Sequence, residues 1–137
     1  MEQKSKKAAL QFKNYLIDQC SFSFKNVSIS KEMEFSITPE VSFDKDKHSF
    51  ELLMNVAIND KEHYLDINMR IRGFFDYSGE DTNLLRNFIG INAPAILFPY
   101  IRSYISNITA LGGIQPVIMP TLNMTAVGNQ LLNSISL

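Results

Sequence analysis

The sequence predicts an α+β fold, with an antiparallel sheet of four strands followed by a long kinked helix and a short terminal helix. Two observations lead to this prediction. Up to about residue 72, apolar and polar residues alternate in separate runs that short turns connect. From about residue 78 onward, apolar residues recur every three or four positions, which is typical of helices. The 137 residues fit one domain, 1–137, of which we expect residues 1–9 to be flexible.

Four runs carry the strand pattern. The run Phe12–Phe24 alternates imperfectly, and a second strand begins at Val41–Phe43, before a charged turn. Phe50–Ile58 alternates throughout. Leu65–Arg72 is the clearest strand, because Leu65, Ile67, Met69 and Ile71 form an apolar face opposite a polar one. Since short turns connect these runs, the sheet should be antiparallel.

Residues 25–40 are interpreted as a long, partly extended connection. Met33, Phe35 and Ile37 alternate with polar residues in it, and Pro39 then interrupts the pattern. Proline lacks a backbone N–H, so it is confined to strand edges and loops. We therefore expect this connection to carry exposed apolar side chains up to the strand that begins at Val41.

The long helix begins after a cluster of possible capping residues, namely Ser78, Asp81 and Thr82. Helical spacing continues as far as Leu111, and Gly112-Gly113 then predicts the end of the helix. Pro94 and Pro99 lie inside the pattern, where each removes a backbone donor and clashes with the preceding turn. We expect a kink near these two prolines.

A short last helix follows a proline-containing extended stretch. Asn123 or Thr125 can cap it, and its apolar stripe consists of Val127, Leu131, Leu132 and Ile135. A helix of this length is marginal in isolation, so it must pack against another surface.

Charge is distributed unevenly along the chain. All 13 Lys and Arg and all 14 Asp and Glu lie in residues 1–102, and the last 35 residues contain no charged side chain and no His. Charged side chains normally cover solvated surface, so an uncharged stretch of this length should itself be covered. It can form a subunit interface, a groove that binds other chains, or simply the core.

Chemistry-bearing motifs are missing. The sequence has no GxxxxGK[ST], HExxH or GxSxG pattern, so it predicts neither an enzyme nor a cofactor or metal site. His48 and His63 stand alone in charged turns, and Cys20 is the only cysteine and lies on an apolar strand face. A net charge of -1 indicates no nucleic-acid partner. With no signal-like or 18-residue apolar segment, we expect a soluble, cytoplasmic protein without membrane insertion.

One stretch, Asn92–Arg102 with the sequence NAPAILFPYIR, resembles the signature of the SecB family of protein-export chaperones. That family carries a similar Pro-Asn-Ile-Leu-Phe-Pro-Tyr-Ala-Arg run in its kinked long helix. Three flanking patches are also similar to the family: Arg72-Gly73-Phe74-Phe75, Thr38-Pro39-Glu40-Val41, and Met119-Pro120 with Leu122-Asn123. The resemblance covers residues 10–135 in order.

The resemblance implies a sheet with both helices on one side, subunits that assemble as a homotetramer (a dimer of dimers), and grooves that bind unfolded or precursor polypeptides without ATP. It places the groove walls in the loop from Phe24 to Pro39 and in the last helix, and Val41 and Phe43 match groove positions. With residues added from the apolar pattern, the expected client-binding set is Phe24, Met33, Phe35, Ile37, Val41, Phe43, Val127, Leu131 and Leu132. The expected oligomer interface contains Ile67, Met69, Ile71, Tyr100 and Tyr104. Ordinary core is the alternative for each client-binding residue.

The sequence departs from the family pattern at two places that concern binding to the translocation motor SecA. The family's contact with the translocation motor SecA uses acidic positions, which correspond here to Gln19, Ser23 and Asn68, none of them acidic. The chain also ends at Ser136-Leu137 without an acidic tail. Two functions therefore stay open: delivery of export clients to SecA, and protection of an antitoxin or another dedicated client. A structural or adaptor subunit without a client groove is the alternative from another functional class.

Overall fold

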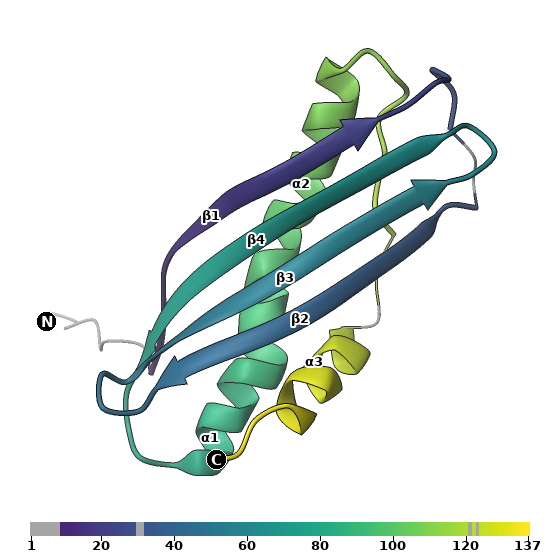
Figure 1. Ribbon diagram of the computed structural model, residues 1–137. Helices are drawn as coiled ribbons and strands as arrows, with labels where there is room; N and C mark the ends of the chain where they lie inside the picture. The colour runs from purple at the N-terminus through teal and green to yellow at the C-terminus, as the bar shows by residue number, and fades with distance from the viewer. Residues whose placement is uncertain (1–8, 30–31, 121, 123) are drawn as a thin grey trace, which may run out of the picture.

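The computed structural model describes residues 9–29, 32–120, 122 and 124–137. Four strands come first: β1 (Leu10–Ser23), β2 (Glu34–Asp44), β3 (Ser49–Asp60) and β4 (Leu65–Tyr77). They form one antiparallel sheet in the order β1-β4-β3-β2, so β1 and β2 are its edges (Figure 1). The helices follow: α1 (Thr82–Asn87), a π-helical turn η1 (Phe88–Asn92), α2 (Ala93–Leu111) and α3 (Met124–Asn133). The predicted α+β fold with four antiparallel strands is confirmed.

β2 is longer than the sequence reading predicted. It begins at Glu34 rather than Val41, so part of the expected connection is strand, including Pro39. Pairing with β3 runs without a register shift from Glu34 opposite Asn59 to Asp44 opposite Ser49. The sheet accommodates Pro39 because β2 is an edge strand, whose outward backbone positions need no donor.

The imperfect alternation of β1 has a structural cause. Register shifts interrupt its pairing with β4 at two places, between Phe12 and Asn14 and between Ile17 and Gln19. Each extra residue turns the following side chains to the other face. Phe12, Ile17 and Cys20 therefore share the helix-facing side although their positions are not all even or all odd.

The long helical segment contains a π-helical turn just before its first proline. Asp81, one of the three possible capping residues, caps α1 by accepting hydrogen bonds from the backbone N–H groups of Asn83 and Leu84. η1 then precedes Pro94, which lies in the first turn of α2, and Pro99 lies inside α2. The widened turn is where the chain adapts to a proline that cannot donate a helical hydrogen bond. Gly112 ends α2, as predicted.

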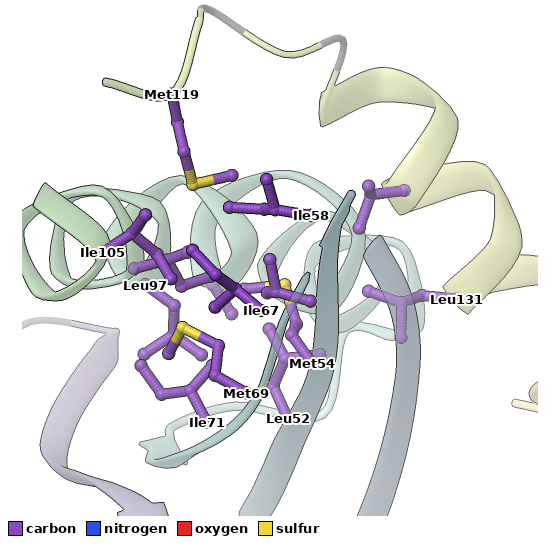
Figure 2. Close-up of a cluster of buried hydrophobic side chains, with 14 of the residues drawn as sticks. Leu52, Met54, Ile58, Ile67, Met69, Ile71, Leu97, Ile105, Met119 and Leu131 are labelled. Carbon is purple, nitrogen blue, oxygen red and sulfur yellow. The ribbon is translucent and has the colours of Figure 1, made fainter. Parts of the chain in front are cut away.

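The core lies between one face of the sheet and the helices (Figure 2). Alternate residues of β3 and β4 are fully buried against Leu97, Ile101 and Ile105 of α2. This overturns part of the predicted oligomer interface, because Ile67, Met69 and Ile71 are buried within the single subunit. Their alternation identified a buried face correctly, but the subunit's own helices cover that face.

Part of the uncharged C-terminal region is subunit core. Ile114, Val117 and Met119 are buried, although the stretch that contains them has no regular secondary structure. Side chains of α2 hold this stretch in place: Ser106 Oγ donates to the Val117 carbonyl at 3.0 Å, and the Val117 N–H donates to Thr109 Oγ1 at 2.9 Å. The alternative that the region is core thus holds for part of it, whereas Leu111 at 87% and Ile118 at 71% remain exposed.

The helical run Thr82–Leu111 is long and apolar enough to span a membrane when only length and composition are considered. In this fold it packs against the sheet, and the core helix of a soluble protein passes the same test.

α3 begins at Met124. Thr125 lies inside the helix and so is not its N-cap, and Asn123 lies outside the described residues. Ile135 follows the end of the helix and still packs against the core.

Candidate functional site

Half-buried apolar side chains follow β2 on the side of the sheet that faces the helices. Phe35, Ile37, Val41 and Phe43 occupy alternate positions of the strand, pack against the core and keep part of their surface exposed. α3 contacts β2, and its Leu132 is also half-buried (Figure 1). The structure thus brings together predicted client-binding residues from two elements. We call these five side chains the β2–α3 surface.

Two other predicted residues, Phe24 and Met33, belong to the connection between β1 and β2. Both are half-buried against the core. The ring centroid of Phe24 lies 5.4 Å from that of Phe22 on β1, and Met33 immediately precedes β2. The connection therefore extends the apolar surface at the end of the sheet where β1 ends and β2 begins (Figure 1).

Two α3 residues of the expected client-binding set are buried in the subunit. Val127 is 8% exposed and Leu131 is 0% exposed, and both belong to the core, where Figure 2 shows Leu131. In this arrangement they anchor α3 and offer no surface to a client. The apolar stripe of the helix predicted Val127, Leu131 and Leu132 as client-binding residues together. Of these three, only Leu132 at the edge of the stripe remains partly accessible.

A glycine contact that the sequence reading missed positions α3. A Cβ added at Gly128 would lie only 2.1 Å from the backbone oxygen of Gly90 in η1, so only glycine allows this approach. The next residue on that side, Leu132, packs over Gly90 itself. Gly128 inside a predicted helix was the available signal, since glycine disfavours helix interiors unless close packing needs it.

Aromatic residues of α2 pack beside the other sheet edge. The Tyr100 ring centroid lies 4.4 Å from that of Tyr15 and 5.6 Å from that of Phe12, both on β1. Tyr15 and Tyr100 are still 39% and 37% exposed. Tyr104 interacts with Cys20, and partial burial raises the pKa of both groups. Tyr100 and Tyr104 thus remain accessible enough for the predicted oligomer interface.

The open face of the sheet carries an ion-pair network. Arg70 donates to both carboxylate oxygens of Asp18, at 2.9 and 2.7 Å, and Arg72 bridges Asp18 at 2.9 Å and Glu51 at 2.6 Å. The hydrogen bonds from Arg70 and then Arg72 hold the pKa of Asp18 well below its usual range. These pairs largely neutralise one another at the centre of the face.

Comparison with known proteins identifies the family. The family model of SecB, described as preprotein translocase subunit SecB, matches residues 3–134. The chain belongs to the SecB family. It is 31% identical over 129 residues to "Uncharacterized protein MJ0357" of Methanocaldococcus jannaschii, covering 88% of this chain and 83% of that protein. It is 29% identical over 105 residues to the protein-export protein SecB of Magnetococcus marinus, covering 74% and 67%.

Among solved structures, this SecB-family chain is similar to the Mycobacterium tuberculosis SecB-like chaperone Rv1957 in complex with a ChAD peptide from the HigA1 antitoxin. The TM-score is 0.69 at 17% sequence identity, with 83% of this chain and 91% of that chain covered. This likeness confirms the SecB-like fold. SecB-family proteins are chaperones, so the prediction of a non-enzyme is also confirmed.

The three positions that correspond to the family's acidic SecA contacts lie together on the open face of this SecB-family sheet. Gln19, Ser23 and Asn68 are all exposed there, and Gln19 is opposite Arg70 in the pairing of β1 with β4. The nearest carboxylates on this part of the face are Asp18, which is paired with two arginines, and Asp66. The three positions therefore carry no acidic side chain, although Asp66, which accepts a hydrogen bond from Asn68 Nδ2 at 3.3 Å, keeps one carboxylate beside them.

Proposed function

We propose that this SecB-family protein is an ATP-independent holdase that binds non-native polypeptides on the β2–α3 surface. The carrying observation is the row of half-buried apolar side chains at alternate positions of β2, next to α3. Each contact is worth only about 25 cal/mol per Å² of apolar area buried, so a client must bind several such surfaces at once. Linking weak contacts along one client chain raises the total affinity steeply.

A homotetramer fits this proposal, because several copies would offer several such surfaces to one client. β1 suits pairing between subunits: it is a 14-residue edge strand without proline, and Tyr15 and Tyr100 remain partly exposed beside it. Unpaired edge strands invite pairing with another chain. A cytoplasmic location belongs to the same proposal, and a place in protein export is the alternative to a dedicated client.

Two observations favour a dedicated client over general delivery to SecA. Gln19, Ser23 and Asn68 provide no acidic group on the open face. The similar Mycobacterium tuberculosis chaperone is in complex with an antitoxin peptide in its solved structure. We therefore propose that this protein guards one client or a few, such as an antitoxin. Identification of the proteins that co-purify with it from its own cell tests this proposal: one small partner would support it, and many different precursors would favour general export.

The double substitution Val41→Asp with Phe43→Asp tests the holdase. Charges on the β2–α3 surface should abolish its apolar character, so suppression of aggregation of an unfolded, slow-folding protein should fall at least tenfold. The matched control is Thr38→Asp with Ser42→Asp, which adds the same charges to the same strand on the opposite face. Size-exclusion chromatography must show the same oligomer for both variants.

Equal holdase activity in the two double variants would rule out the β2–α3 surface as the client site. If the unmodified protein ignores unfolded protein altogether, it is an adaptor or structural subunit instead.

A further inference from the structure

Charge is segregated between the two sides of the subunit. On β2, β3 and β4, charged residues alternate with core residues, so their side chains lie on the open face of the sheet, away from the helices. These residues are Glu34, Glu40, Asp44, Glu51, Asp66, Arg70, Arg72 and Asp76. Ion pairs with them hold Lys13 and Asp18 of β1 on the same face. The exception is Asp60 at the end of β3, which is buried.

The helical layer, which consists of α1, η1, α2 and α3, has no acidic side chain. From Thr82 to Leu137 the sequence contains only two charged residues, Arg86 in α1 and Arg102 in α2. The exposed positions of α3 carry small, hydroxyl and amide side chains: Thr125, Ala126, Asn129, Gln130 and Asn133. The β2–α3 surface therefore lies on a side of the subunit where the helices contribute positive charge alone.

Arg86 is the cation that its own subunit leaves without an anion. The Arg102 guanidinium donates to the Met119 carbonyl at 3.3 and 3.2 Å and lies 5.6 Å from the centroid of the Phe98 ring. Arg86 is half-buried, yet its guanidinium forms no hydrogen bond, ion pair or ring contact with any residue that the structure describes. Since α1 continues directly into η1, Arg86 is also not at a free helix end with unpaired carbonyls. Its five N–H donors stay available to an anion.

Arg86 lies close to the β2–α3 surface. It precedes Gly90 by four positions in one continuous helical run, so the two residues share a face of that run. Leu132 of the β2–α3 surface packs over Gly90, because a Cβ added to this glycine would lie 2.9 Å from Leu132 Cδ1. α3 packs against η1 along this side of the sheet (Figure 1). Arg86 is therefore one helical turn away from an apolar side chain of the proposed client surface.

We infer that Arg86 selects client segments in which Asp or Glu flanks the apolar residues, and that segments with basic flanks bind more weakly. This inference rests on the proposed holdase function and adds the charge of the client to it. A guanidinium binds a carboxylate through two parallel hydrogen bonds, which makes the pair directional as well as strong. The helical layer offers no carboxylate to a client lysine or arginine.

A client carboxylate fits Arg86 better than one from a second copy of this chain. A copy that packs its helical layer against this one brings no acidic side chain to the contact. The acidic residues just before α1 are already engaged, since Glu80 pairs with His48 at 2.8 Å and Asp81 caps the helix. The strand carboxylates of any copy lie on its open face, away from the helices. The anion must therefore come from another kind of chain.

Three labelled peptides test the inference. They share one apolar core of Phe, Leu and Ile and differ only in their flanks, which are acidic, amide or basic. By fluorescence anisotropy at low ionic strength, the acidic peptide should bind the unmodified protein about fivefold more tightly than the amide peptide. The basic peptide should bind most weakly of the three. Added salt should reduce these differences, because it screens charge.

Arg86→Gln should remove the preference, so that the acidic and amide peptides bind within about twofold of each other. The affinity for the amide peptide should stay unchanged, and Arg86→Lys should retain part of the preference because it keeps the charge. Lys61→Gln is the matched control, since it removes the same charge from the exposed β3–β4 turn at the other end of the sheet. Thermal unfolding and size-exclusion chromatography verify the fold and the oligomer of each variant.

Equal affinities of the three peptides for the unmodified protein would overturn charge selection and leave the holdase proposal standing. An acidic preference that persists in Arg86→Gln, or that Lys61→Gln abolishes equally, would also overturn the role of Arg86. A smaller oligomer in Arg86→Gln that Arg86→Lys restores would assign the guanidinium to a subunit contact instead. Failure of all three peptides to bind would overturn the holdase proposal and this inference together.

Discussion

Replacing Gly128 with alanine should loosen α3 from the subunit. The added Cβ would lie 2.1 Å from the Gly90 oxygen, whereas real Cβ contacts are essentially never shorter than 3.0 Å. α3 and η1 would have to separate by about 1 Å, and the obstacle is backbone, which cannot rotate away as a side chain can. Overpacking of this kind typically costs about 1–3 kcal/mol.

Two effects limit how much unfolding free energy the Gly128→Ala substitution can cost. Alanine is a better helix former than glycine by about 1 kcal/mol, which opposes the clash. If α3 detached completely, the burial of Val127 and Leu131 would be lost, at about 1.5–3 kcal/mol for each side chain. We therefore expect Gly128→Ala to lower the free energy of unfolding by about 1–3 kcal/mol.

Urea denaturation at one fixed protein concentration measures this loss, because the stability of an oligomer depends on concentration. Hydrogen exchange should quicken in Met124–Asn133 more than in β3 and β4. Asn129→Ala is the matched control: the residue is exposed in the same helix, so alanine brings the better propensity without a clash. The reasoning is refuted if Gly128→Ala is as stable as Asn129→Ala.

Two further substitutions test contacts that hold the fold. Thr109→Val should cost about 1–3 kcal/mol of unfolding free energy in denaturant titration, because it leaves the N–H of Val117 without its acceptor in the core. The control is Ser103→Val, at an exposed site of the same helix, which should cost much less. Asp18→Asn should destabilise the protein at pH 7. Since the folded pKa of Asp18 lies below its ordinary 3.8, its stabilising contribution is complete above that value and fades as the pH falls below it. The difference between Asp18→Asn and the parent should therefore narrow below about pH 4, and a difference independent of pH would contradict the network.

Several elements of the fold were readable from local pattern. The alternation of Leu65–Arg72 and Phe50–Ile58 identified two central strands, and the proline-containing helix segment carried the family resemblance. β2 could have been read in full, because Phe35, Ile37, Val41 and Phe43 keep one parity through Pro39. Proline obscured that pattern, since its effect on a strand depends on whether the strand is an edge.

The sequence by itself determined the faces of the two central strands, the end of the long helix at Gly112 and the family, because these depend on neighbours along the chain. Only the tertiary structure decided what covers each apolar face. Ile67 and Leu131 are core, whereas Phe43 and Leu132 stay partly exposed, although all four belong to similar apolar patterns. Periodicity reports the direction of a side chain and carries no information about what packs opposite it. That partner is set by contacts between residues far apart in sequence, such as Gly90 with Gly128.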